Sequence, residues 1–588
     1  MKTLCHFAAF VGIAVLPSLA AADALKHVPA DAAVVIRINN METTNAKLVK
    51  MAKQMGVEAT PWSDPLATML AAGKLNAGVR KNADLTLIGF APNRDAGGFE
   101  VPLLLLIPID DYNAFVANFG QGRKDGEVDV VKFPRVPLPG YILKLDEYAA
   151  VSASKARLPQ GAAPMDLTSA CGKVLADAKN DLALYMNTKL VSDAFGPMMK
   201  RSQEQMLARF EAMYKQSGGA EQFAPVLRAM AAQWINMSAE TMRDANAMAL
   251  GLSLTDAGLR ATQTIDMAPK SRLGQMVAQM KNTDASFTAG LPEADYAVFG
   301  GIAHDGQVSA KFFADLMGPV VEEAAKIGES GKSMSAIVDA YKAALGTMDG
   351  TTFGIVLDPK DQAGMVKGVT LFDGDSKVFA QSQAQVRQAA GQLGKAMGGP
   401  LRNVEVTPKV KTVDGVALDK VSAPLKADPA NPRDVMATQL ASRMLGGAGL
   451  TVWSGAIDAK RTIQIIGPDE KLAEPAVAAA KAKSDAVGKR ELLKAPNSQL
   501  PANRFAVAYV AVDKVVAAGV QLANMEMGGN LQVNLKPNLP PIGIALSADG
   551  SVLRLDAVVP AELVDSLVSA FLQIKLQVMG GGVKPGGL

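Results

Sequence analysis

The chain has 588 residues, of which 49% are hydrophobic, 20% are charged and 5% are aromatic, with 60 Lys and Arg against 57 Asp and Glu. This composition is typical of a globular protein with a large core and excludes a disordered chain. The two charge signs are mixed along the sequence and aromatic residues are scarce, so nothing indicates the basic face of a nucleic-acid-binding protein.

The first 22 residues have the pattern of a secretory signal peptide. Lys2 precedes an apolar run from Phe7 to Leu19, and small residues follow at Ala20 and Ala22. The run is shorter than the roughly 20 residues that span a bilayer. We therefore expect cleavage after Ala22 and export to the periplasm or the extracellular space, and we expect no later transmembrane segment. Loss of Lys2 lowers the net charge from +3 to +2.

The rest of the chain repeats a pattern of strand, helix, hairpin and helix about five times. Its clearest openings are three proline-led strands, which begin near Pro29, Pro292 and Pro501. The pattern predicts an α+β fold with antiparallel sheets covered by helices, arranged as two similar halves, roughly 28–281 and 291 to the end. Such a repeat predicts an architecture and leaves the chemistry open.

The first two repeat units are predicted over 23–157 and 158–288. The first has a strand at Ala33–Ile38, a helix at Thr43–Met55 and a hairpin of Asp84–Phe90 with Glu100–Ile107. Two extra strand-like runs follow, at Glu127–Phe133 and Tyr141–Ala153. The second has a strand at Leu182–Asn187 and a long helical region that extends up to Asn246. Its hairpin is Ala247–Leu254 with Leu259–Met267. Alternation of apolar residues between turn signals supports these strands.

The later units are predicted over 289–495, which holds the third and fourth, and 496–578, which holds the fifth, before a flexible tail at 579–588. Their strands are predicted at Tyr296–Ala303, within the hairpin Thr352–Phe372, and at Val404–Val410, Gly415–Val421, Gly449–Ile457, Arg461–Ile466, Phe505–Val512, Ile542–Ala548 and Ser551–Val558. Asp549-Gly550 between the last two runs is a strong hairpin signal.

The second unit is rich in methionine. Met206 and Met213 lie seven residues apart, as do Met230 and Met237, and this spacing places each pair on one side of a helix. The sequence therefore predicts a helical hairpin between Asp193 and Asn246. Three interpretations of these side chains stay open: core packing of the hairpin, an adaptable apolar surface for a protein or lipid partner, and thioether binding of copper.

Cys171 is the one cysteine that remains after the predicted cleavage, because Cys5 lies in the signal peptide. An internal disulfide is therefore excluded in the mature chain. Cys171 is expected to be a buried small hydrophobic residue, with a reactive or intermolecular thiol as the alternative.

Motifs for enzymatic chemistry are weak. Ser152 and Lys155 match a Ser-x-x-Lys pattern without its partner motif, and no nucleophile elbow accompanies His27 or His304. The carboxylates at Asp110-Asp111 and Asp373-Gly374-Asp375 are expected to cap helices and turns. We therefore predict no catalytic residue, no metal site and no cofactor.

The segment from Val28 to Ile36, which follows the signal peptide, begins with a Pro-Ala-Asp strand motif. In this motif and in its repeated layout, the chain resembles large exported bacterial proteins of unknown function. The resemblance implies an exported location and brings no catalytic residues.

Three functions are compatible with these observations. The leading hypothesis is an exported, non-enzymatic envelope or secreted scaffold that binds another molecule, with Met206, Met213, Met230 and Met237 as the candidate surface. The second is a hydrolase with an unrecognised site between the halves, using carboxylates or Ser152 and Lys155. The third is a carrier of an apolar ligand or lipid that uses the methionine-rich hairpin.

Overall fold

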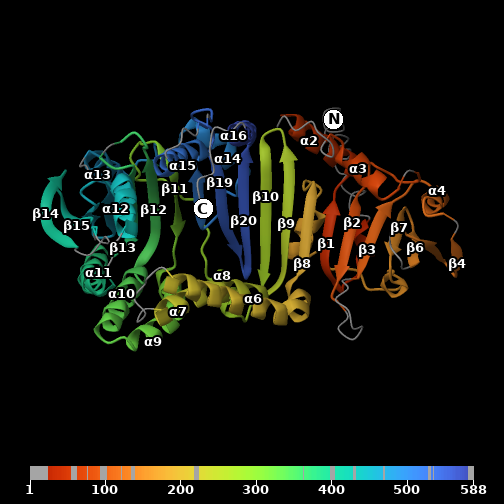
Figure 1. Cartoon of the computed structure of the whole chain (residues 1–588), viewed down its shortest axis with the longest axis horizontal. Coiled ribbons are helices and arrows are strands. Elements are labelled where there is room, and N and C mark those ends of the chain that lie inside the picture. Colours follow the sequence, from red (N-terminus) through yellow and green to blue (C-terminus); the bar gives the residue numbers. More distant parts are fainter. Residues whose placement is uncertain are drawn as a thin grey trace, which may run out of the picture. The chain divides into compact units, whose positions relative to one another are not determined.

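The computed structural model describes residues 24–579, apart from 55–62, 76, 93–101, 121, 134–138, 217–223, 362, 398–403, 428, 430–431, 468–470, 528–531 and 534. It confirms the predicted α+β class and the antiparallel pairing of the strands (Figure 1). The signal peptide and nearly all of the predicted tail lie outside the described residues.

The chain divides into two compact units. The first comprises residues up to 199, together with 241–274 and 552–555. The second comprises 200–240, 275–551 and 556 onward. Each unit is described by itself below.

The sheet of the first unit has the strand order β10-β9-β8-β1-β2-β3-β7-β6-β5-β4, and neighbouring strands pair antiparallel. Its strands are β1 (Ala32–Ile38), β2 (Leu85–Phe90), β3 (Leu103–Pro108), β4 (Arg123–Asp125), β5 (Val128–Lys132), β6 (Pro139–Leu145), β7 (Tyr148–Ser152), β8 (Leu182–Asn187), β9 (Ala245–Thr255) and β10 (Gly258–Met267). The predicted single run Tyr141–Ala153 is therefore wrong. It is two strands, because the chain turns at Asp146, whose φ is 49°.

The first unit also contains α2 (Met41–Gln54), α3 (Pro65–Ala72), α4 (Tyr112–Ala117) and α5 (Ala170–Ala176). Asp64 and Asp111 cap α3 and α4 by accepting backbone N–H bonds. The core lies on one face of the sheet, where Val35, Ile88 and Leu104 pack against the 3-10 helix Ala24–His27 and Leu175 of α5. This packing fixes the positions of the strands of the first unit.

A buried ion pair lies at one end of β1 and β2. The Arg37 guanidinium meets the carboxylate of Asp84, with Nη2 and Oδ2 2.7 Å apart, and Arg37 Nη1 donates to the carbonyl of Leu175 at 2.8 Å. Asp84 also accepts the backbone N–H of Asn40. The charges are thus satisfied by groups from β1, β2 and α5, as burial of a charge requires.

The sheet of the second unit has the strand order β19-β18-β11-β12-β13-β17-β16-β15-β14. Its strands are β11 (Tyr296–Ala303), β12 (Met348–Leu357), β13 (Val366–Gly374), β14 (Glu405–Val413), β15 (Val416–Ala423), β16 (Leu450–Asp458), β17 (Arg461–Ile466), β18 (Ala506–Val510) and β19 (Ile542–Asp549). β20 (Val552–Pro560), whose longer part belongs to this unit, pairs with β19.

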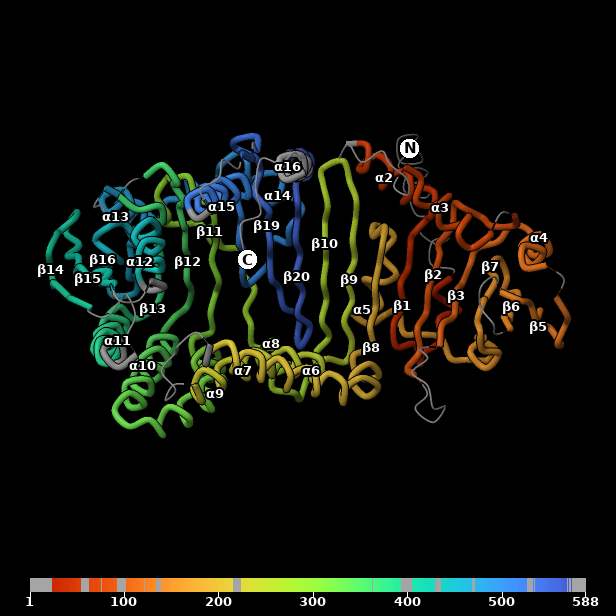
Figure 2. The backbone as a smooth tube through the Cα atoms, in the orientation of Figure 1, coloured from red at the N-terminus to blue at the C-terminus, as the bar shows by residue number. Residues whose placement is uncertain are grey.

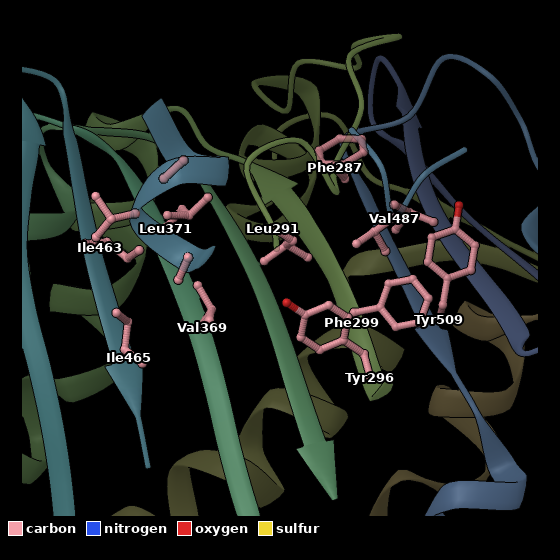
Figure 3. Packing of buried hydrophobic residues seen from close by; sticks show 14 of the residues in the cluster. Phe287, Leu291, Tyr296, Phe299, Val369, Leu371, Ile463, Ile465, Val487 and Tyr509 are labelled. Atoms are coloured by element: carbon pink, nitrogen blue, oxygen red, sulfur yellow. The ribbon is translucent and has the colours of Figure 1, made fainter. Parts of the chain in front are cut away.

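The helices of the second unit are α9 (Gly306–Ala325), α10 (Glu329–Leu345), α11 (Ser376–Met397), α12 (Pro432–Leu445), α13 (Ala473–Ala482), α14 (Glu491–Gln499), α15 (Val512–Met527) and α16 (Ala561–Met579). The core again lies on one sheet face. Phe299 and Tyr509 stack with ring centroids 5.1 Å apart (Figure 3). Val477 of α13 and Leu493 of α14 belong to the same cluster.

The two strand orders correspond. From β9 onward, the first unit has the order β9-β8-β1-β2-β3-β7-β6-β5-β4. The second unit has the order β19-β18-β11-β12-β13-β17-β16-β15-β14, so each strand carries the label of its counterpart plus ten. Even an irregularity recurs, because β1 shifts register against β2 between Ala32 and Val34, and β11 shifts against β12 between Tyr296 and Val298.

Candidate functional site

The predicted methionine-rich region forms two helices, α6 (Thr188–Gln216) and α7 (Ala224–Asp244). Three of the four predicted methionines are exposed: Met206 by 50%, Met213 by 62% and Met230 by 37%. Met237 is half-buried. The exposed thioethers show that core packing does not account for Met206 and Met213.

Trp234 of α7 is a further exposed apolar side chain and was not among the predicted residues. It is 66% exposed, and it shares one side of α7 with Met230 and Met237 because the three lie four and three residues apart. The spacing of four and three residues is visible in the sequence, whereas the predicted surface held methionines alone. We call Met206, Met213, Met230, Trp234 and Met237 the Met-Trp surface.

The end of this helix pair that adjoins residues 217–223 is held by polar and apolar contacts. Arg228 Nη1 lies 3.5 Å from Glu211 Oε2 and so joins α7 to α6. Val226 is buried against Val320 and Ala324 of α9. A cavity of about 590 Å³ is lined by these two helices and Glu323 of α9. The packing on α9 fixes the base of α7, while Met230 and Trp234 of the same helix stay exposed.

A second apolar surface lies on the sheet of the first unit, on the face opposite its core. Along β9 the side chains alternate between buried and half-buried, and the half-buried positions are all apolar: Met248, Leu250, Leu252 and Leu254. A sheet with one solvated face normally carries polar residues there. This face is instead apolar and only half-buried.

Strand register aligns these residues into rows across neighbouring strands. One row runs Leu87, Ile36, Leu184, Leu250 and Gln263 over β2, β1, β8, β9 and β10. A second row runs Val34, Met186, Met248 and Ile265 over β1, β8, β9 and β10. All nine side chains are half-buried. We call these two rows the apolar sheet face.

The residues considered for a hydrolase are engaged by separate partners. Ser152 is buried and its hydroxyl donates to the carbonyl of Leu103 at 2.8 Å. Lys155 Nζ pairs with Asp125 Oδ2 at 2.6 Å. A nucleophile that is activated by a base shares a hydrogen bond with that base. Ser152 and Lys155 instead bond to Leu103 and Asp125.

Two of the carboxylates considered for acid and base work, Asp111 and Asp375, cap helices as expected. Asp111 accepts backbone N–H bonds from Asn113 and Ala114 at the start of α4. Asp375 does the same at the start of α11, and Asp373 pairs with Arg461.

His304 is half-buried and its ring lies within 3.4 Å of Ser309 Oγ and 3.3 Å of Thr351 Oγ1. Burial lowers the pKa of the His304 imidazole. Cys171 is fully buried against Ala247 and Ala249, and burial raises the pKa of its thiol to about 12. The prediction of a buried small hydrophobic residue at Cys171 is confirmed.

Within the described part of the chain, no group of three or more His, Cys, Asp or Glu is arranged to hold a metal ion. No helix of that part combines the length and the apolar character needed to span a bilayer. Comparison with family models, with curated proteins and with solved structures gave no match.

Proposed function

We propose that the chain is an exported, non-enzymatic scaffold that binds a partner protein of the cell envelope through the Met-Trp surface. The exposure of Met213 on α6, and of Met230 and Trp234 on one side of α7, carries this proposal, because exposed large apolar side chains mark sites of interaction. Methionine suits such a surface since its side chain repacks against varied shapes. Residues 1–22 direct the export.

We also propose that the scaffold is built from two similar halves of repeated strand-helix-hairpin-helix units. The shared strand order and the shared bulge support this. So does the pairing of Val35 with Tyr185 and of Phe299 with Tyr509, which places a tyrosine at the same register position on β8 and β18. A scaffold of this kind holds its shape by sheet pairing and leaves its helices available for contacts.

Of the two alternatives, the apolar-ligand carrier has support from the exposed methionines, which form a surface that hydrocarbon can contact. The hydrolase gains no support from Ser152 and Lys155, whose side chains have separate partners.

The test is a pull-down from envelope extract with the chain expressed from Asp23. We expect the wild type to retain a stoichiometric protein that is lost when Met206, Met213, Met230 and Met237 are all changed to Gln. Met436→Gln is the matched control, because Met436 on α12 is 64% exposed and lies outside the Met-Trp surface. Circular dichroism verifies that the variants fold.

Recovery of the same protein by the wild type and the fourfold variant would contradict the proposed surface. A monomer that retains nothing would contradict the binding function itself.

A further inference from the structure

We propose that the apolar sheet face of the first unit binds a long hydrocarbon chain, such as that of a fatty acid. This ligand class and this site lie beyond the proposed function, which uses the Met-Trp surface. The inference begins from the two faces of one sheet. On the core face Val35, Ile88 and Leu104 are fully buried, whereas Ile36, Leu184 and Leu250 on the opposite face keep contact with solvent.

The size of this face indicates a binding site. Five strands at a spacing of about 4.8 Å span roughly 20 Å, and successive residues on one face lie about 7 Å apart. The half-buried side chains of the apolar sheet face therefore form one contiguous band, unlike the scattered exposure of single hydrophobic residues that is normal on a protein. An acyl chain spans about 15 Å, half of a hydrocarbon core about 30 Å thick, and so fits along one row.

The chemistry of the face favours hydrocarbon over protein. The two rows hold no charged side chain, and Gln263 is their one polar residue. A protein partner brings polar groups that need hydrogen bonds, about one per 100–200 Å² of interface, and this face has almost none to offer. A methylene chain needs none, and its burial stabilises the complex by about 0.8 kcal/mol per CH₂ group.

The surroundings of the face favour a single chain over a bilayer. Met41 of α2 and Leu66 of α3 pack on Ile38 and Leu85, at one end of the same face, and Figure 2 shows α2 and α3 at that end of the strands. α4 packs on Leu105 of β3. These helices stand above the plane of the strands, so a flat membrane surface is held off while one extended chain reaches the rows.

The test is a titration of the chain expressed from Asp23 with cis-parinaric acid, whose fluorescence rises in an apolar environment. We expect saturable binding of one equivalent by the wild type. Leu184→Gln with Leu250→Gln places two amides at the centre of the face and is expected to weaken binding at least tenfold. Leu184→Phe is the second variant. It keeps the face apolar, so the protein should stay folded, and the larger side chain occupies the position of the bound hydrocarbon.

The matched control is Met206→Gln with Met213→Gln, which alters the Met-Trp surface and is expected to leave fatty-acid binding unchanged. Absence of saturable binding by the wild type would overturn the inference. Equal binding by the wild type, the Leu184→Gln, Leu250→Gln protein and the Leu184→Phe protein would overturn it as well. If the methionine control alone lost binding, the fatty acid would bind at the Met-Trp surface and the inference would be overturned. The pull-down described above reports separately on the proposed function.

Discussion

The guanidinium of Arg37 and the carboxylate of Asp84 form an ion pair from which solvent is excluded, with the two side chains 0% and 2% exposed. Because both charges have left water, each depends on the other and on the backbone groups of Asn40 and Leu175. Because it needs these specific partners, the pair fixes β1, β2 and α5 relative to one another more strictly than apolar contacts would.

We predict that Asp84→Ala lowers the free energy of unfolding of the first unit by about 3–5 kcal/mol, because it leaves a buried guanidinium without its counter-ion. The double change Arg37→Met with Asp84→Leu is expected to be less destabilising than Asp84→Ala alone. Urea unfolding followed by circular dichroism measures both. Lys50→Ala, which breaks the exposed pair with Asp256, is the control and should cost much less than Asp84→Ala. Equal losses for the buried and exposed pairs would show that Arg37 is not held as described.

We predict that the thiol of Cys171 does not react with Ellman's reagent at pH 8 while the protein is folded. Burial raises its pKa to about 12, so almost no thiolate forms, and the reagent has no access to the sulfur. In guanidinium chloride the chain expressed from Asp23 should release one equivalent of chromophore. Rapid labelling of the folded protein would contradict the burial of Cys171.

We predict that His304 makes the second unit less stable in acid. Its folded-state pKa is lowered from 6.5 by burial, so the unfolded chain binds a proton at a higher pH than the folded chain. The stabilisation is present above the unfolded pKa and is lost as pH falls through the folded pKa. The melting temperature of His304→Gln should therefore fall less than that of the wild type between pH 8 and pH 5. Parallel falls would exclude a role for His304.

We predict that Trp234 and Trp453 differ in fluorescence. Trp234 is 66% exposed, whereas Trp453 is 2% exposed in the core of the second unit beneath Lys420. Trp234→Phe should remove a red-shifted component that acrylamide quenches readily, and Trp453→Phe should remove a blue-shifted, protected one. A partner that covers the Met-Trp surface should shift the Trp234 emission to shorter wavelength. Unchanged quenching on removal of Trp234 would contradict its exposure.

Strands with clear turn signals could be predicted from the sequence almost to the residue. Leu182–Asn187, Tyr296–Ala303 and Arg461–Ile466 match β8, β11 and β17 at both ends. The break between β6 and β7 was missed because Asp146 turns the chain without a glycine. Short helices such as α3, α5, α12 and α14 were also missed, since less than four turns of periodic pattern is weak evidence for a helix.

The two surfaces differ in how far the sequence could reveal them. Helical spacing located the methionines of α6 and α7, but exposure is a tertiary property and spacing could not separate core from surface. The apolar sheet face gave a period-two signal on β9 but none on β1. Neighbouring positions such as Val35 and Ile36 are both apolar, so alternation vanishes, and only the strand register divides them between the two faces.

The matching register of the two units also bears on how the chain reaches its native pairing. β1 and β11 each pair with two neighbours in a similar register, so exchange of one strand for the other is a pairing error open to the folding chain. Arg37 of β1 and Gly301 of β11 oppose Ala183 and Val507 at the same register position. A Cβ on Gly301 would lie 2.6 Å from the carbonyl oxygen of Thr351, whereas Arg37 reaches the carboxylate of Asp84. An exchanged pairing would leave a buried cation without its carboxylate and is therefore expected to be less stable than the native pairing.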